Sequence, residues 1–174
     1  MAFDNPLIKD LVIPLERYPH LWEFNTLHDA VQAINAYTYG TNERIRYDEL
    51  LVLNERNELS GIVTLPDILQ CLHPRLKEAS KIKIFEGKES EFDDLTILWE
   101  DSFFVECTKR SRIPIKDCMS PIHHIVRGGA PALKGLAIML KTKSVVLPVI
   151  DEDRVIGVIR LKELFTAITA KCRL

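Results

Sequence analysis

The chain has 174 residues, 47% of them apolar, and its 23 Lys and Arg residues nearly balance its 25 Asp and Glu residues. This composition excludes a disordered chain, and the lack of a block of like charge argues against a nucleic-acid partner. No apolar run is long enough to span a bilayer, and residues 1–6 lack the basic start and apolar block of a signal peptide, so we expect a cytoplasmic protein without membrane contact.

The first part of the chain is predicted to form one βαββα unit. Its first helix has the i, i+3, i+4, i+7 spacing of a buried face, at Leu27, Ala30, Val31 and Ile34. Short apolar runs on either side of the polar turn 54–57 then indicate a hairpin. The predicted strand, helix, strand, strand and helix cover residues 20–24, 26–37, 49–53, 59–63 and 65–76.

A segment at residues 77–113 separates this unit from the rest of the chain. Residues 81–85 are typical of a short strand. Ser90 with Asp93 matches a helix start that has an acid three residues after the N-cap, and apolar residues at rough helical spacing follow. We therefore predict an insert with a helix at 91–109, which is either a linker helix or a helix that docks on the core or on a partner.

The remainder of the chain repeats the first unit. The similarity is clearest between residues 61–69 and 157–165. The second set of elements is predicted at residues 122–126, 131–141, 145–150, 155–159 and 161–171, with a buried helical face at Leu133, Leu136, Ala137 and Leu140. One unit of about 60 residues buries too little surface to be robust alone, so we expect the two to share a core. The predicted fold is α+β, with the two sheets facing each other and the helices outside.

The four cysteines, Cys71, Cys107, Cys118 and Cys172, lie far apart and form no C-x-x-C motif. We expect them to be buried as small hydrophobic residues, with neither a metal site nor a dithiol redox site. A catalytic cysteine with His73, His123 or His124 would need an ordered nucleophile, base and orienting group, and no motif supplies one. His123 and His124 are neighbours on a predicted strand and should point in opposite directions. We do not expect an enzyme.

Two motifs resemble those of a known family. A Gly-h-h-Thr-x-x-Asp pattern at 61–67 follows an apolar strand and a turn, and Asp117–Pro121 reads Asp-Cys-Met-Ser-Pro. Both are similar to motifs of CBS (cystathionine-β-synthase) domains, which occur in tandem pairs. The resemblance implies a CBS pair, with repeat 1 at 8–76, the insert at 77–113 and repeat 2 at 114–172. It also implies a regulatory ligand-binding module that requires no cofactor, forms a homodimer and regulates a partner protein.

The first motif has two interpretations. Thr64 ends a strand and begins a helix, where unpaired N–H groups and the helix dipole favour an anion. Asp67 offers two acceptor oxygens to the two hydroxyls of a ribose, and Gly61 allows a close approach. The same spacing fits a helix cap, with Thr at the N-cap and an acid at N3, which needs no ligand. Spacing alone favours the cap, and the family resemblance favours ligand binding.

The resemblance also implies an adenine-containing ligand, namely AMP, ADP, ATP or S-adenosylmethionine. It places the adenine in an apolar slot near Val12, Ile13, Pro14, Leu50 and Leu51, all of which are equally good core residues. These five residues complete the predicted first site with Gly61, Thr64 and Asp67.

The copy of the first motif in repeat 2 departs from the family. Arg160 stands where Thr or Ser is expected and Glu163 where Asp is expected, and the degenerate second site also includes Met119 and Pro121. The bulk of Arg160 could fill the slot, or its guanidinium could donate to a phosphate as a bidentate donor. We expect this second site to be empty or altered.

Charges next to the first site restrict the ligand. Asp48 and Glu49 would repel a polyphosphate, although Arg44 and Arg46 lie nearby and could compensate. The acids favour AMP or a cationic adenosyl compound. The leading hypothesis is a module that senses an adenine nucleotide or adenosyl compound in the cleft between the repeats, and the alternative is a ligand-free dimerisation or protein-interaction module.

Overall fold

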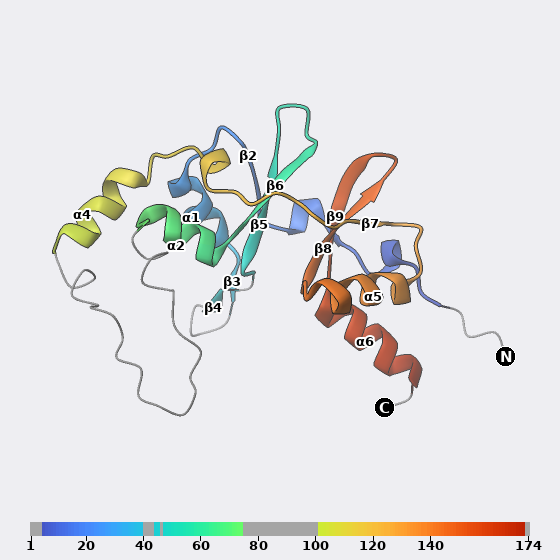
Figure 1. Cartoon of the computed structure of the whole chain (residues 1–174). Helices are drawn as coiled ribbons and strands as arrows, with labels where there is room; N and C mark the ends of the chain where they lie inside the picture. Colours follow the sequence, from blue (N-terminus) through green and yellow to red (C-terminus); the bar gives the residue numbers. More distant parts are fainter. Residues whose placement is uncertain (1–4, 40–43, 46, 75–100, 173–174) are drawn as a thin grey trace, which may run out of the picture.

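The computed structural model describes residues 5–39, 44–45, 47–74 and 101–172 (Figure 1). The first half contains, in chain order, η1 (Ile8–Asp10), β1 (Ile13–Pro14), η2 (Leu15–Arg17), β2 (His20–Trp22), α1 (Leu27–Asn35), β3 (Thr38–Tyr39), β4 (Arg44–Ile45), β5 (Glu49–Leu53), β6 (Leu59–Thr64) and α2 (Leu65–Leu72). The second half contains α4 (Asp101–Arg110), η4 (Ile115–Asp117), β7 (Val126–Arg127), α5 (Ala132–Thr142), β8 (Val146–Asp151), β9 (Arg154–Arg160) and α6 (Leu161–Cys172). The predicted α+β fold with two repeats is confirmed.

Two predicted elements differ clearly from the structure. The first is α2, which ends at Leu72, four residues before its expected end, because Pro74 disfavours helical backbone at His73. The second is the strand expected at 122–126, which is wrong. Only Val126 and Arg127 pair with β8, and residues 122–125 have no ladder partner. His123 and His124 are therefore exposed residues of a connection and do not alternate on a strand.

The two sheets exchange the segments with which each repeat begins. We call residues 9–14 the first leading segment and residues 116–121 the second leading segment. One sheet has the order β2-β5-β6, and the other has the order β1-β9-β8-β7. Strand β1 of the first leading segment thus pairs with β9 of repeat 2. Ser120 of the second leading segment pairs with Ile62 of β6, through reciprocal N–H to C=O bonds of 2.8 and 3.0 Å.

Gly157 makes the pairing of β1 with β9 possible. Its φ is +151°, and a Cβ atom at this position would lie 2.0 Å from the carbonyl oxygen of Ile13. Only glycine adopts this backbone conformation without strain, and only glycine leaves space for the neighbouring strand.

The core consists of one apolar cluster beside each sheet and a third cluster between the sheets, and Ile8 joins the cluster of repeat 2 while Ile115 joins that of repeat 1. The cluster between the sheets contains Tyr18, Tyr47 and Leu51 from repeat 1 and Val158 from repeat 2, all at most 3% exposed. The helices lie on the outer sides of the two sheets (Figure 1). The sheet-to-sheet arrangement is therefore confirmed.

The predicted buried face of α5 is wrong. Leu133 and Leu140 are 53% and 66% exposed, while the buried residues of the helix are Ala132, Gly135 and Met139. The helix carries two apolar stripes. The stripe with the smaller residues faces the core because Ile8 packs closely on Gly135. An apolar strip thus remains on the outer surface of α5.

The part of the predicted helix 91–109 that precedes residue 101, and the strand predicted at 81–85, lie outside the described residues. Helix α4 packs on α2, where the ring of His73 stacks on Phe103 at 4.6 Å between centroids and Arg110 Nε donates to the carbonyl oxygen of Cys71 at 2.7 Å. Within the described ranges, no helix has the length and apolar character that a membrane span requires.

The expectation that the four cysteines are buried as small hydrophobic residues is also wrong, since Cys71, Cys107 and Cys118 are partly exposed and Cys172 is exposed. Cys71 in α2 and Cys118 directly after η4 form a disulfide across 47 residues of sequence. The sequence alone could not indicate this pair, because the two cysteines become neighbours only when the fold brings the end of α2 beside the second leading segment. Cys107 and Cys172 are free thiols.

We predict that Gly157→Ala lowers the free energy of unfolding by at least about 3 kcal/mol, because the new methyl group meets the backbone of β1. Gly129→Ala is the matched control, since a Cβ atom there has nothing within 4 Å, and it should change stability by less than about 1 kcal/mol. Urea unfolding measures both values. Equal stabilities of the two variants would contradict the close approach of β1 and β9.

Candidate functional site

A cavity of about 670 Å³ opens beside the start of α6, and both repeats contribute to its walls. The residues that border it are Tyr18, Tyr47, Asp48, Glu49, Val145, Val146, Arg160, Leu161, Lys162, Phe165 and Thr166. Repeat 1 thus supplies two tyrosines and two acids, while repeat 2 supplies mainly apolar and basic residues.

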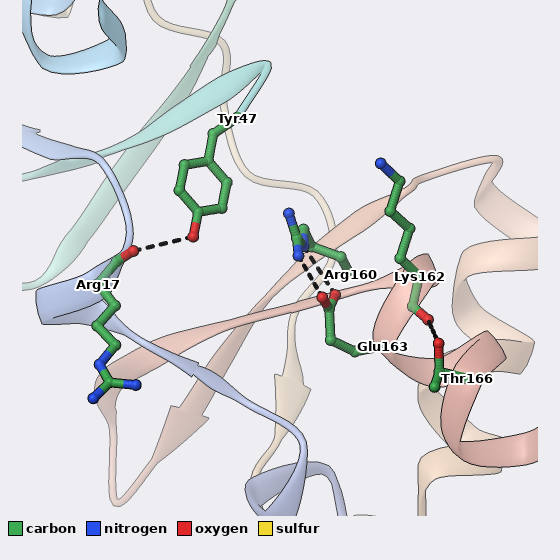
Figure 2. Close-up of polar contacts among 6 residues, drawn as sticks. All are labelled: Arg17, Tyr47, Arg160, Lys162, Glu163 and Thr166. Atoms are coloured by element: carbon green, nitrogen blue, oxygen red, sulfur yellow. Dashed lines mark hydrogen bonds and ion pairs between the residues drawn. The ribbon is translucent and has the colours of Figure 1, made fainter. Parts of the chain in front are cut away.

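The wall from repeat 1 is a buried aromatic pair next to an acid. The ring centroids of Tyr18 and Tyr47 lie 4.8 Å apart, and the Tyr47 hydroxyl donates to the carbonyl oxygen of Arg17 at 3.2 Å (Figure 2). The Tyr18 hydroxyl donates to Glu49 Oε1 at 3.4 Å. Burial raises the pKa of Tyr18, so this hydroxyl keeps its proton.

Glu49 is a carboxyl group with an altered proton affinity. Burial raises its pKa to about 7, the hydrogen bond from Tyr18 opposes this change, and the charges of Asp48 and Asp67 add to it. The cavity therefore contains an acid that changes its charge near neutral pH.

The wall from repeat 2 contains the departure from the family motif. Arg160 donates from Nε to Glu163 Oε2 at 2.9 Å, and a second N–H group of Arg160 contacts Glu163 Oε1 (Figure 2). Burial disfavours the ionised form of Glu163, but the hydrogen bond and the charge of Arg160 hold its pKa below the usual value. The guanidinium carbon of Arg160 lies 5.3 Å from the centroid of the Tyr47 ring, a cation–π distance. Arg160 is thus held in place by a carboxylate and a ring, and it borders the cavity without filling it.

The first motif adopts the helix-cap geometry. Asp67 Oδ2 accepts hydrogen bonds from the backbone N–H and the hydroxyl of Thr64, at 2.9 and 2.7 Å. The Thr64 hydroxyl oxygen accepts from the Asp67 N–H at 3.3 Å, which completes a capping box. The second oxygen of Asp67 accepts from the Ser120 hydroxyl at 3.4 Å. The carboxylate therefore faces its own helix start, and Thr64 and Asp67 lie outside the four cavities that Arg160, Val12, Glu23 and Leu133 border.

The other predicted residues of the first site are distributed over different environments. Val12, Ile13 and Pro14 line a second cavity of about 540 Å³. Leu50 and Leu51 are fully buried core residues. None of the four cavities is lined by both the predicted adenine slot and the Thr64–Asp67 pair.

The remaining site predictions concern the second leading segment and the arginines before β5. Met119 packs against Gly61, where a Cβ atom would lie 2.6 Å from its sulfur, and Pro121 is exposed. Arg46 lies outside the described residues, and so does the side chain of Arg44. Sequence reasoning did not single out Tyr18, Tyr47 or Lys162 as site residues. The sequence repeat could have indicated Tyr47. Tyr47 and Asp48 stand directly before β5, just as the cavity residue Val145 stands directly before β8.

Comparisons with known proteins agree with the family resemblance. A family model for the CBS domain matches residues 8–74 and 115–170. No curated protein matches the chain in sequence. A crystal structure of a CBS domain-containing protein of unknown function from Kribbella flavida superposes with a TM-score of 0.70 at 14% identity, over 95% of this chain and 99% of that chain.

Two further similar structures contain nucleotides. CBSX2 in complex with AMP has a TM-score of 0.62 at 18% identity, over 94% of this chain and 96% of that chain. The cytosolic domain of the Mg²⁺ channel MgtE in complex with ATP has a TM-score of 0.56 at 16% identity, over 90% of this chain and 46% of that chain. At these identities the similarity establishes the fold.

We predict that Glu49 makes the stability of the chain depend on pH between about 4.5 and 7. The folded chain holds a proton on Glu49 in this window that the unfolded chain has released, so the free energy of unfolding falls as the pH rises and levels off above about 7. The change attributable to Glu49 is on the order of 3 kcal/mol. Urea unfolding of the wild type and of Glu49→Gln at several pH values isolates it.

The matched control is Glu55→Gln in the exposed β5–β6 turn, which should keep the wild-type pH profile. A Glu49→Gln profile parallel to that of the wild type would show that Glu49 ionises as an ordinary surface acid.

Proposed function

Since this chain belongs to the CBS-domain family, we propose that it is a regulatory module, with repeats at 8–76 and 114–172, that binds an adenine-containing ligand in the cavity beside Arg160. The observation that carries the proposal is the cavity itself, which has walls from both repeats and a volume typical of small-molecule sites. The AMP and ATP complexes of similar structures support an adenine nucleotide as the class of ligand. CBS pairs are generally non-catalytic, which agrees with a binding function.

The chemistry of the walls suits a flat heterocycle with a polar attachment. Val146, Leu161 and the ring of Tyr47 offer apolar and aromatic surface to a base. Glu49 and Asp48 offer acceptors to amino or hydroxyl groups of the ligand. Lys162 lies at the start of α6 and Thr166 one turn further on (Figure 2), so a phosphate beside Lys162 would meet a helix N-terminus and an ammonium group.

The charges favour a ligand with little negative charge. Arg160 is compensated by Glu163, which leaves Lys162 as the uncompensated cation among the residues that line the cavity. Asp48 stands on the opposite wall and repels a polyphosphate, and Glu49 adds to this repulsion when it is ionised. We therefore propose that AMP or a cationic adenosyl compound such as S-adenosylmethionine binds better than ADP or ATP.

A second function, ligand-free homodimerisation or docking of a partner protein, is favoured by a different observation. Leu133 and Leu140 are 53% and 66% exposed on α5, away from the residues that line the cavity. Large apolar residues exposed on an outer helix are typical of a protein–protein contact. In this case the cavity would result only from the altered residues Arg160 and Glu163 of repeat 2 and would have no ligand.

We predict that Thr166→Trp abolishes the stabilisation by the ligand, because the indole would occupy the cavity that Thr166 borders. Thr169→Trp is the matched control, since Thr169 lies on the same helix away from the cavity. Both hydroxyls donate to the carbonyl four residues earlier, at 3.0 and 2.8 Å, so both variants lose the same kind of bond. Thermal unfolding with AMP, ATP and S-adenosylmethionine measures the effect, and a ligand at one hundred times its Kd should add about 2.7 kcal/mol to the wild type and to Thr169→Trp.

No stabilisation of the wild type by any of the three compounds would contradict the proposed function. Equal stabilisation of both tryptophan variants would place the ligand elsewhere. A stronger effect of ATP than of AMP would contradict the argument from charge alone.

For the second function, we predict that Leu140→Glu converts a dimer to a monomer, because a charge would be buried in the contact. Sedimentation velocity of the wild type and the variant tests this, with Lys141→Glu on the polar side of the same helix as the control. A wild type that is monomeric at high micromolar concentration would contradict homodimerisation.

A further inference from the structure

The disulfide lies at the junction of the two repeats. Cys71 is in the last turn of α2, and Cys118 is the first residue after η4, in the second leading segment. Both cysteines are partly exposed, so a small reductant reaches them more easily than a bond in the core. The bond fastens the second leading segment to the last helix of repeat 1.

The two residues that follow Cys118 make contacts at the first motif. Met119 fills the space above Gly61, and Ser120 exchanges two backbone hydrogen bonds with Ile62. The Ser120 hydroxyl also donates to Asp67 Oδ1 at 3.4 Å. The second leading segment therefore covers β6 and the start of α2, from Gly61 to Asp67.

Other contacts hold the start of this segment, since Cys118 and Met119 also pack against the core cluster of repeat 1. The backbone N–H of Ile115 donates to the carbonyl oxygen of Asn25 at 2.7 Å, and Ile115 is fully buried, so the segment is anchored before Cys118. On the other side, residues 121–125 are partly or fully exposed and pair with no strand until β7 begins at Val126. Between these points the disulfide is the single covalent restraint that the described residues provide.

We propose that Cys71–Cys118 is a redox-controlled crosslink. It keeps the second leading segment on β6 when it is oxidised and releases the segment when it is reduced. A dithiol reductant transfers two electrons and two protons, the Sγ–Sγ bond breaks, two thiols form and the reductant becomes a disulfide. The released segment withdraws Met119 from Gly61 and Ser120 from Asp67. One oxygen of the Asp67 carboxylate and the surface of Gly61 then face solvent, and the first motif becomes accessible to a ligand.

This inference does not rest on the proposed function. The release concerns the backbone of Ile62 and Ser120, and it is measurable without any ligand. The cavity beside Arg160 contains no residue of the second leading segment, so ligand binding there and release of the segment succeed or fail separately.

The experiment is hydrogen–deuterium exchange of the full chain, treated with oxidised glutathione or with dithiothreitol, in the absence of ligand. We expect the amides of Ile62 and Ser120 to exchange at least tenfold faster in the reduced chain, while those of Val149 and Val158 in the β8–β9 ladder stay unchanged. Equal exchange at Ile62 and Ser120 in the two forms would overturn the proposal. Faster exchange throughout the chain would overturn it as well, since it would indicate general destabilisation.

Variants separate the disulfide from other effects of the reductant. Oxidised Cys118→Ser should exchange like the reduced wild type, and Cys107→Ser, which lacks a free thiol only, should keep the full response to dithiothreitol. If Cys118→Ser does not fold, the reduced wild type supplies the same comparison. Iodoacetamide should label two thiols per native oxidised chain and four after reduction, and labelling of all four in the oxidised chain would refute the disulfide.

Discussion

The exchange of leading segments determines how the two repeats meet, because each sheet contains or contacts the first segment of the other repeat. Strand β1 extends the sheet of repeat 2, and Ser120 pairs with β6 of repeat 1. Neither repeat can therefore complete its backbone hydrogen bonds without the other. The cluster around Tyr18, Leu51 and Val158 forms between the exchanged parts. The cavity also depends on this exchange, since its walls come from both repeats and would face solvent in an isolated repeat.

The two repeats use the same backbone geometry with different chemistry at the start of the closing helix. Leu65 N–H donates to the carbonyl oxygen of Asp48 at 3.0 Å, and Leu161 N–H donates to that of Val145 at 2.8 Å. At the i, i+3 pair that follows, repeat 1 has a capping box and repeat 2 has an ion pair. The Asp67 carboxylate bonds back to its own helix start, whereas Arg160 borders the cavity. The cavity of about 670 Å³ thus lies beside the copy of the motif that departs from the family.

The sequence predicted the elements whose pattern is local and missed the features that depend on contacts between distant segments. Strand β5 and the limits of α6 follow from apolar runs and from the repeat, and the first motif was open between a cap and a ligand site, of which the structure shows the cap. The buried face of α5 could not be predicted, because two apolar stripes compete and the position of Ile8 decides between them. Neither could the Cys71–Cys118 pair, which depends on the docking of the second leading segment. For the same reason the tyrosines of the cavity, which lie 29 positions apart in sequence, gave no motif.

The cavity and the disulfide both act on the cluster between the sheets. Tyr18 and Tyr47 belong to this cluster and also line the cavity, so a ligand that contacts them changes packing between the repeats. Ile62 packs against the same cluster and pairs with Ser120, so release of the second leading segment changes it from the other side. Both events involve one shared structure, and any coupling between them is reciprocal. If both proposals hold, a ligand that binds better to the oxidised chain must also make the disulfide harder to reduce, and the module would report ligand and redox state as one signal.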